Sequence, residues 1–207
     1  MELTTALSPS RELVERAPAR HKWLSCISPA KNKLLSDWTV DQLNIRPYQQ
    51  IMEIGFGPGY GLELAARQLK VGLLAGIDES VQMYQKAYAK NKNLVRQQLL
   101  QLHVGSIADL SYPHHYFHTI FGSNSHYSWS KPVNHYISLT NMLKTGGKLV
   151  MGFQPSWART ESELQHEAHR VARDFEEAGL IDIQLEFRDA HPASYVAVTG
   201  FKETPFP

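Results

Sequence analysis

Ile51-Met-Glu-Ile-Gly-Phe-Gly-Pro-Gly-Tyr-Gly61 is the stretch that decides the fold. It predicts a short buried strand that ends at Glu53-Ile54 and runs into a glycine-rich turn, after which a helix begins near Tyr60. The glycines of the turn can adopt φ > 0 and leave no Cβ between the backbone and a ligand. The free N–H groups and the dipole at the start of the helix favour an anionic group. The stretch therefore predicts a ligand-binding turn, whose glycines are Gly55, Gly57 and Gly59.

The spacing of these glycines distinguishes between kinds of cofactor turn. A dinucleotide turn, G-x-G-x-x-G/A, would need glycine or alanine where Tyr60 or Leu62 stands. A P-loop would need Gly-Lys-Ser/Thr after the glycines, which is missing. The remaining pattern, E-x-G-x-G-x-G from Glu53, resembles motif I of the class I S-adenosylmethionine-dependent methyltransferases. The alternative is a turn that only lets strand and helix pack closely.

An acidic pair follows the next apolar run. Residues 71–77 are almost continuously apolar, as expected for a parallel strand that is buried on both faces, and Asp78-Glu79 ends the run. A carboxylate at the end of this strand can accept hydrogen bonds from both ribose hydroxyls of a nucleoside cofactor. The alternative interpretation of Asp78 is a solvated acid at a helix N-terminus.

Strands and helices alternate along the rest of the chain. Further strands are predicted at 102–104, 117–122, 148–153, 181–187 and 193–201. Helices are predicted to begin at Ser28-Pro29, Tyr60, Ser80, Lys131-Pro132 and Thr160, with residues 90–101 finishing the third helix and residues 144–147 closing the fourth. The alternation predicts an α/β fold with a Rossmann-like, doubly wound, seven-stranded sheet in three αβα layers. The sheet should be mostly parallel and end in a C-terminal antiparallel β-hairpin.

Length and composition limit the other possibilities. A chain of 207 residues fits an N-terminal arm over residues 1–27 and a single domain over residues 28–207, and the resemblance implies that this domain binds S-adenosylmethionine. A net charge of +1 disfavours nucleic acid as a partner, and the single Cys26 excludes an internal disulfide. The histidines near position 115 lack a metal-binding pattern, so no metal is expected. No apolar run reaches the roughly 18 residues that cross a membrane, so we expect a cytoplasmic protein, whose oligomeric state stays open.

The resemblance to the methyltransferases implies S-adenosyl-L-methionine as the cofactor and a small molecule as the methyl acceptor. It implies that the glycine turn and Glu53 hold the methionine part, and that Asp78 binds the ribose. Ser106 stands where the family commonly has an acidic or amide residue against the adenine, and Asp109 is the candidate substitute. The full set of candidate cofactor-binding residues is Glu53, Gly55, Phe56, Gly57, Gly59, Asp78, Glu79, Met83, Gly105, Ser106, Ile107 and Ser123.

The candidate catalytic residue is His126, which follows the fourth predicted strand. A neutral imidazole there could remove a proton from an acceptor that must lose one. Tyr127 and Trp129 could line an aromatic acceptor pocket or simply pack in the core. Two other functions stay open, an NAD(P)-dependent oxidoreductase on the same framework and a non-catalytic S-adenosylmethionine-binding protein.

Overall fold

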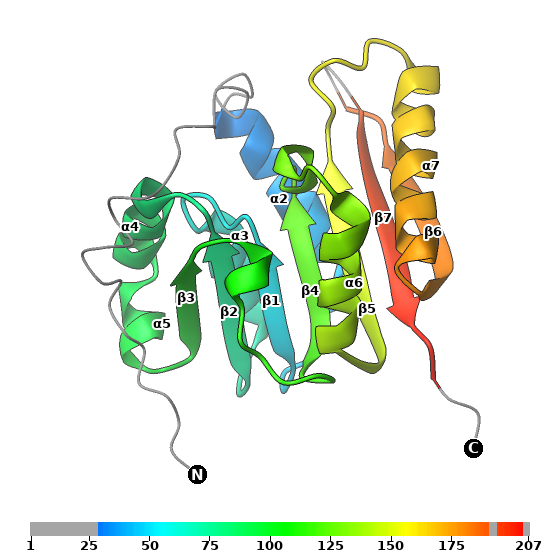
Figure 1. Cartoon of the computed structure of the whole chain (residues 1–207). Helices are drawn as coiled ribbons and strands as arrows, with labels where there is room; N and C mark the ends of the chain where they lie inside the picture. The colour runs from blue at the N-terminus through cyan, green and yellow to red at the C-terminus, as the bar shows by residue number, and fades with distance from the viewer. Residues whose placement is uncertain (1–28, 191–193, 205–207) are drawn as a thin grey trace.

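Residues 29–190 and 194–204, which the computed structural model describes, form one seven-stranded sheet with helices on both faces (Figure 1). The strand order is β3-β2-β1-β4-β5-β7-β6. The first five strands in this order run parallel, whereas β7 is antiparallel to both β5 and β6. The strands are β1 (Gln50–Ile54), β2 (Leu73–Asp78), β3 (Leu100–Val104), β4 (Phe117–Ser123), β5 (Leu143–Phe153), β6 (Leu180–Arg188) and β7 (Tyr195–Lys202). The predicted fold class is confirmed.

The helices cover the two faces of the sheet and bury a core on each. On one face, α3, α4 and α5 pack against β2 and β3, and α2 packs against β4 and β5. On the other face, α6 and α7 pack against β4 to β7. The helices are α2 (Pro29–Gln42), α3 (Tyr60–Gln68), α4 (Val81–Lys90), α5 (Lys92–Arg96), α6 (Pro132–Met142) and α7 (Glu161–Glu177), with short 3₁₀ turns η2 (Ile107–Asp109) and η3 (His126–Ser128).

Local signals in the sequence account for several helix boundaries. The Ser80 side chain accepts a hydrogen bond from the Met83 N–H, and Thr160 and Glu163 form the capping box that begins α7. Trp38 of α2 is 6% exposed and packs against Tyr195 of β7, with ring centroids 6.1 Å apart. Trp38 is therefore a core residue in this structure.

The strand register brings the ends of the parallel strands to one edge. Ile54 is opposite Ile77 on one side and Gly122 on the other, and Asp78 is opposite Val104. The chain leaves this edge through the loops that carry the candidate residues. We call it the carboxyl edge of the sheet; it is the upper edge in Figure 1.

Two predicted boundaries were wrong because tertiary contacts replace the expected local ones. Helix α6 ends at Met142, and its last carbonyl groups accept hydrogen bonds from Lys202 Nζ and from the His115 and Tyr116 N–H groups rather than from a glycine cap. Residues 143–147 instead begin β5, because buried Leu143 pairs with Phe117.

The third predicted helix is also shorter than expected. It ends at Lys90, α5 follows, and β3 begins at Leu100 instead of at position 102. The buried side chain of Asn91 interrupts the helix here. The arm over residues 1–27, Ser28 and the predicted strand start at Ala193 lie outside the described residues.

Candidate cofactor site at the carboxyl edge

The glycine-rich turn joins β1 to α3 at the carboxyl edge, as predicted. Gly55, Gly57 and Gly59 have φ values of 70°, 52° and 82°, in the left-handed region that glycine adopts without strain. A Cβ on Gly57 would meet nothing within 4 Å, whereas one on Gly55 would lie 2.7 Å from the Ser125 Cβ. The turn therefore faces open space at Gly57 and the loop after β4 at Gly55.

Asp78 links the end of β2 to this turn. Its Oδ2 accepts a hydrogen bond of 2.9 Å from the Gly57 N–H, and its Oδ1 accepts one of 2.9 Å from the Ser80 N–H. Each carboxylate oxygen can accept more than one hydrogen bond. The backbone thus orients an acidic group between the glycine turn and the start of α4.

Glu53 is buried beneath the first turn of α3. Its side chain is 3% exposed, and its Oε2 has no hydrogen-bond partner among the described residues. Burial and then the negative charge of Asp78 raise the pKa of Glu53 well above its ordinary value, while a hydrogen bond from the Leu62 N–H opposes them. Gly61 leaves room for this group, because an added Cβ would lie 2.8 Å from the Glu53 Cδ.

The loop after β4 contributes more buried polar atoms. The hydroxyl oxygens of Ser123 and Ser125 have no partner within the described ranges. Ser125 lies between Gly55 and Gly122, so its side chain closes the space beside the turn. Buried acceptors that lack partners are rare in proteins and here indicate a place for a polar ligand group. Of these two serines, only Ser123 was singled out from the sequence as a cofactor-binding residue.

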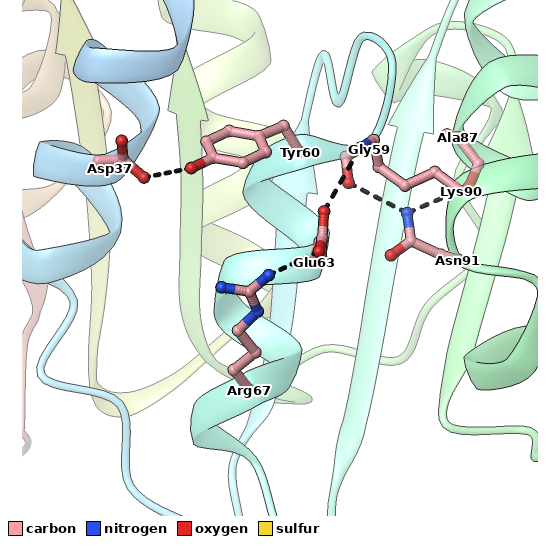
Figure 2. Close-up of polar contacts among 8 residues, drawn as sticks. All are labelled: Asp37, Gly59, Tyr60, Glu63, Arg67, Ala87, Lys90 and Asn91. Atoms are coloured by element: carbon pink, nitrogen blue, oxygen red, sulfur yellow. Dashed lines mark hydrogen bonds and ion pairs between the residues drawn. The ribbon is translucent and has the colours of Figure 1, made fainter.

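The first turn of α3 is held from both sides (Figure 2). The Tyr60 hydroxyl donates to Asp37 of α2 at 2.6 Å, and this hydrogen bond raises the pKa of Tyr60 to about 12. On the other side, Lys90 of α4 pairs with Glu63 at 3.4 Å, and Asn91 donates to the Gly59 carbonyl at 3.0 Å. Neighbouring helices thus fix the position of the turn, which no local signal in the sequence indicated.

Several other predicted residues lie near the same edge, and most of their side chains are buried or half-buried. Phe56 is 2% exposed and packs in the core against Gly76, so only its backbone can face a ligand. Ile107 is also buried, Met83 is half-buried against the core, and Glu79 is exposed. Gly105 has a φ of 146° and follows β3.

Ser106 and Asp109, which the sequence analysis treated as alternatives, bind each other. Asp109 Oδ2 accepts hydrogen bonds from both the N–H and the hydroxyl group of Ser106, at 2.7 and 2.9 Å. The pair caps η2 and fixes the loop that follows β3.

His126 lies deeper than a general base on the surface would. It is 3% exposed, packs between Tyr127 and Phe153, and has no hydrogen-bond partner for either ring nitrogen among the described residues. Its Nε2 lies 3.8 Å from Glu167 Oε1, too far for a hydrogen bond. Burial lowers the pKa of His126, and Glu167 raises it only in part, so the imidazole is neutral at pH 7.

Across residues 29–190 and 194–204, no cluster of histidine, cysteine, aspartate and glutamate could hold a metal ion. Over the same residues, none of the helices has the length and apolar character needed to cross a bilayer.

The strand order, the glycine turn and the acid at the end of β2 define a Rossmann-like fold. A family model described as a methyltransferase domain matches residues 51–147. The uncharacterized methyltransferase YdaC of Bacillus subtilis (strain 168) is 30% identical over 177 residues, which cover 85% of this chain and 96% of YdaC. The chain belongs to the class I S-adenosylmethionine-dependent methyltransferases.

Solved structures agree with this fold. A SAM-dependent methyltransferase from Aquifex aeolicus has a TM-score of 0.67 at 15% identity, over 86% of this chain and 95% of that chain. An N-methyltransferase from Haemonchus contortus, solved with phosphomonomethylethanolamine and S-adenosylhomocysteine, has a TM-score of 0.66 at 13% identity, over 82% of this chain and 52% of that chain. The protein is thus an S-adenosylmethionine-dependent methyltransferase, and the alternatives of an oxidoreductase and of a non-catalytic protein are set aside.

Proposed function

We propose that this enzyme methylates a small-molecule acceptor and that residues 28–207 form its single catalytic domain. The continuous sheet supports the single domain, because β1 to β7 share one hydrogen-bonded order with a core on each face. The near-neutral charge supports a small molecule over nucleic acid, since nucleic-acid-binding domains usually carry clustered basic residues.

The observation that carries the proposed cofactor site is the orientation of Asp78. Two backbone N–H groups hold its carboxylate beside the glycine turn. In this position it can accept hydrogen bonds from ribose hydroxyls. The methionine part of the cofactor then lies along the turn, where Gly57 leaves open space and Glu53, Ser123 and Ser125 supply buried oxygens for its amino group. The adenine side of the proposed site is lined by Met83, Gly105, Ile107 and the Ser106–Asp109 pair.

The bound cofactor supplies a methyl group that is already activated by the neighbouring sulfonium charge. The protein therefore has to align the acceptor and exclude water. The loop from Ser123 to Trp129 bounds the acceptor side in this proposal, because it follows β4 and closes over Gly55. Tyr127 and Trp129 are half-buried there and present aromatic surface.

His126 remains our candidate for the general base. Its neutral imidazole has the protonation state that a base requires. Its burial means that a movement of the loop must bring it to the acceptor. An acceptor that carries no proton to remove would not need this residue.

Titration calorimetry with S-adenosylmethionine tests the cofactor site. Asp78→Asn keeps the shape of the side chain but replaces an acceptor by a donor beside the Gly57 or Ser80 N–H. We expect its affinity for the cofactor to be about 10- to 100-fold lower than that of the wild type. Asp41→Asn, at an exposed position of α2, is the matched control and should bind like the wild type. Equal affinity of Asp78→Asn and wild type would refute the placement of the ribose.

The acceptor class is tested with a cofactor whose methyl group is isotopically labelled. The enzyme is incubated separately with the small-molecule fraction and with the macromolecular fraction of a cell extract. We expect enzyme-dependent label in the small-molecule fraction. Label that enters only protein or nucleic acid would show that the acceptor class is wrong.

A further inference from the structure

Asn91 is a buried polar residue that contacts the glycine turn from the end of α4. It caps the C-terminus of α4 and is 3% exposed. Its side-chain Nδ2 donates to the Gly59 carbonyl at 3.0 Å and to the Ala87 carbonyl at 3.1 Å (Figure 2). The two N–H bonds of this amide therefore join α4 to the turn.

Gly59 is the residue through which Asn91 can act on the cofactor site. It has a left-handed φ of 82°, and it begins α3, because its carbonyl also accepts the Glu63 N–H at 3.2 Å. A Cβ on Gly59 would lie 2.7 Å from Asn91 Nδ2 and 2.8 Å from the Ala87 Cβ. Contact with α4 is thus so close that only glycine fits, and the carbonyl orientation is set by the Asn91 amide.

Asn91 is the buried one of two neighbouring residues that connect the end of α4 to the first turn of α3. Lys90, the residue before it, reaches Glu63 at 3.4 Å and lies 5.9 Å from the centre of the Tyr60 ring. The Lys90–Glu63 pair is largely exposed, with side-chain exposures of 40% and 31%, and such pairs contribute little to stability. The hydrogen bond from Asn91 to Gly59 is buried, and hydrogen bonds are stronger in the low dielectric of the protein interior than in water.

We propose that Asn91 is a positioning residue for S-adenosylmethionine, which fixes the glycine turn in its binding conformation through the Gly59 carbonyl without touching the cofactor. This inference rests on the proposed cofactor site, because it requires the ligand to lie along the same turn. Pre-organised groups bind more tightly because less ordering is left to occur on binding. Loss of the Asn91 amide should therefore reduce the free energy of cofactor binding more than it reduces the free energy of unfolding.

The fold should survive the loss of the amide because neither carbonyl is left unpaired. Gly59 keeps the hydrogen bond from the Glu63 N–H, and the Ala87 carbonyl keeps the one from the Asn91 N–H at 2.9 Å. Variants at position 91 can therefore be compared as folded proteins, which thermal unfolding and circular dichroism verify.

The test compares Asn91→Asp and Asn91→Ser with wild type by titration calorimetry with S-adenosylmethionine. Aspartate replaces Nδ2, which donates to the Gly59 and Ala87 carbonyl oxygens, by an oxygen that cannot donate when it is ionised. Serine removes the hydrogen bond to Gly59, yet its shorter side chain can still bond to the carbonyl four residues earlier. We expect each to bind the cofactor about tenfold more weakly than wild type at pH 8. Asn93→Asp, at an exposed position of α5, has the same charge change and should bind like wild type.

A pH series separates positioning from a general loss of structure. An aspartate between two carbonyl oxygens has a raised pKa, and its protonated form regains one O–H donor for Gly59. The ratio of the dissociation constants of Asn91→Asp and wild type should therefore fall toward one between about pH 8 and about pH 5.5, while the ratio for Asn91→Ser stays constant. Dividing by the wild-type value removes the titration of all groups that the proteins share.

The outcomes distinguish the two proposals. If wild type does not bind S-adenosylmethionine at all, the proposed cofactor site fails. If wild type binds and a folded Asn91→Ser binds equally well, the site stands and the positioning role of Asn91 is refuted. The positioning role would also be refuted if Asn91→Asp and Asn91→Ser bound the cofactor equally weakly and the affinity ratio for Asn91→Asp did not change with pH. The hydrogen-bond donor to the Gly59 carbonyl would then have no effect on binding.

Discussion

Replacing Glu53 with glutamine tests whether Glu53 is a buried carboxyl group whose pKa is raised in the folded protein. The side chain is 3% exposed, and Oε2 lacks a partner within the described residues. Burial and the charge of Asp78 raise the pKa of Glu53 in the folded protein. Glutamine has nearly the same shape and does not titrate. The pH dependence that Glu53 gives to the free energy of unfolding should therefore disappear in the variant.

The sign follows from proton binding. The folded protein keeps the Glu53 proton to a higher pH than the unfolded chain does. The stabilisation from this group is thus fully present below the unfolded-state pKa and is lost as the pH rises toward the folded-state pKa. For one proton the loss is at most about 1.4 kcal/mol per pH unit, beginning near pH ~4.3 where an unfolded glutamate titrates. Relative to wild type, Glu53→Gln should therefore gain stability by up to this amount per pH unit and then level off.

Urea unfolding, followed by circular dichroism at a series of pH values, measures this difference. Glu176→Gln, at an exposed glutamate of α7, is the matched control and should remain parallel to wild type. In an Asp78→Asn background the gain from Glu53→Gln should shrink, because the neighbouring charge that helps to raise the pKa of Glu53 is gone. A constant difference between wild type and Glu53→Gln from about pH 5 to about pH 8 would refute the reasoning, since linkage requires a slope wherever the two pKa values differ.

Two further predictions concern the glycine turn and the buried Glu167 of α7. Gly57→Ala should cost about 1–2 kcal/mol of stability, because its φ of 52° is left-handed and nothing lies within 4 Å of the new Cβ. Its affinity for S-adenosylmethionine should fall far more, since the methyl group enters the ligand's space; unchanged affinity in calorimetry would place the ligand elsewhere. Burial raises the pKa of Glu167, but its surroundings, which include the Arg170 guanidinium 2.8 Å from its Oε1, lower it to about 2. Glu167 therefore stabilises the fold above the ordinary glutamate pKa and loses this effect as the pH falls toward 2. The stability advantage of wild type over Glu167→Gln should shrink on acidification from about pH 4.5, as thermal unfolding would show, and a pH-independent difference would contradict the ion pair.

The parts of the structure that sequence could predict depend on neighbours in the chain. The glycines of the turn, the acid after β2, the Ser80 cap and the Thr160 capping box are all local patterns, and each lies where it was expected. The end of α6 could not be predicted in this way. Its carbonyl groups are satisfied by Lys202, 62 residues away from Thr140, and the Gly146-Gly147 pair that imitated a helix cap lies in β5.

The site residues that sequence reasoning missed also depend on distant contacts. Asn91 lies in a polar stretch without a distinguishing pattern, and its partner Gly59 is 32 residues earlier. Ser125 is one serine among several after β4, and only the packing of Gly55 against it reveals its position. His126 stands at the predicted place in the chain, but its burial against α7 depends on how that helix packs on the sheet.

The position of β7 between β5 and β6 has a consequence for biosynthesis. A ribosome makes β6 before β7, yet within the described part of the chain β6 pairs with β7 alone, and β7 in turn pairs with β5. The nascent chain can therefore assemble β1 to β5 before β6 has a strand to pair with. A transcript interrupted just before Tyr195 would yield a polypeptide with the whole glycine turn but with the open edge of β5 exposed, which is the kind of surface that attracts chaperones and leads to aggregation.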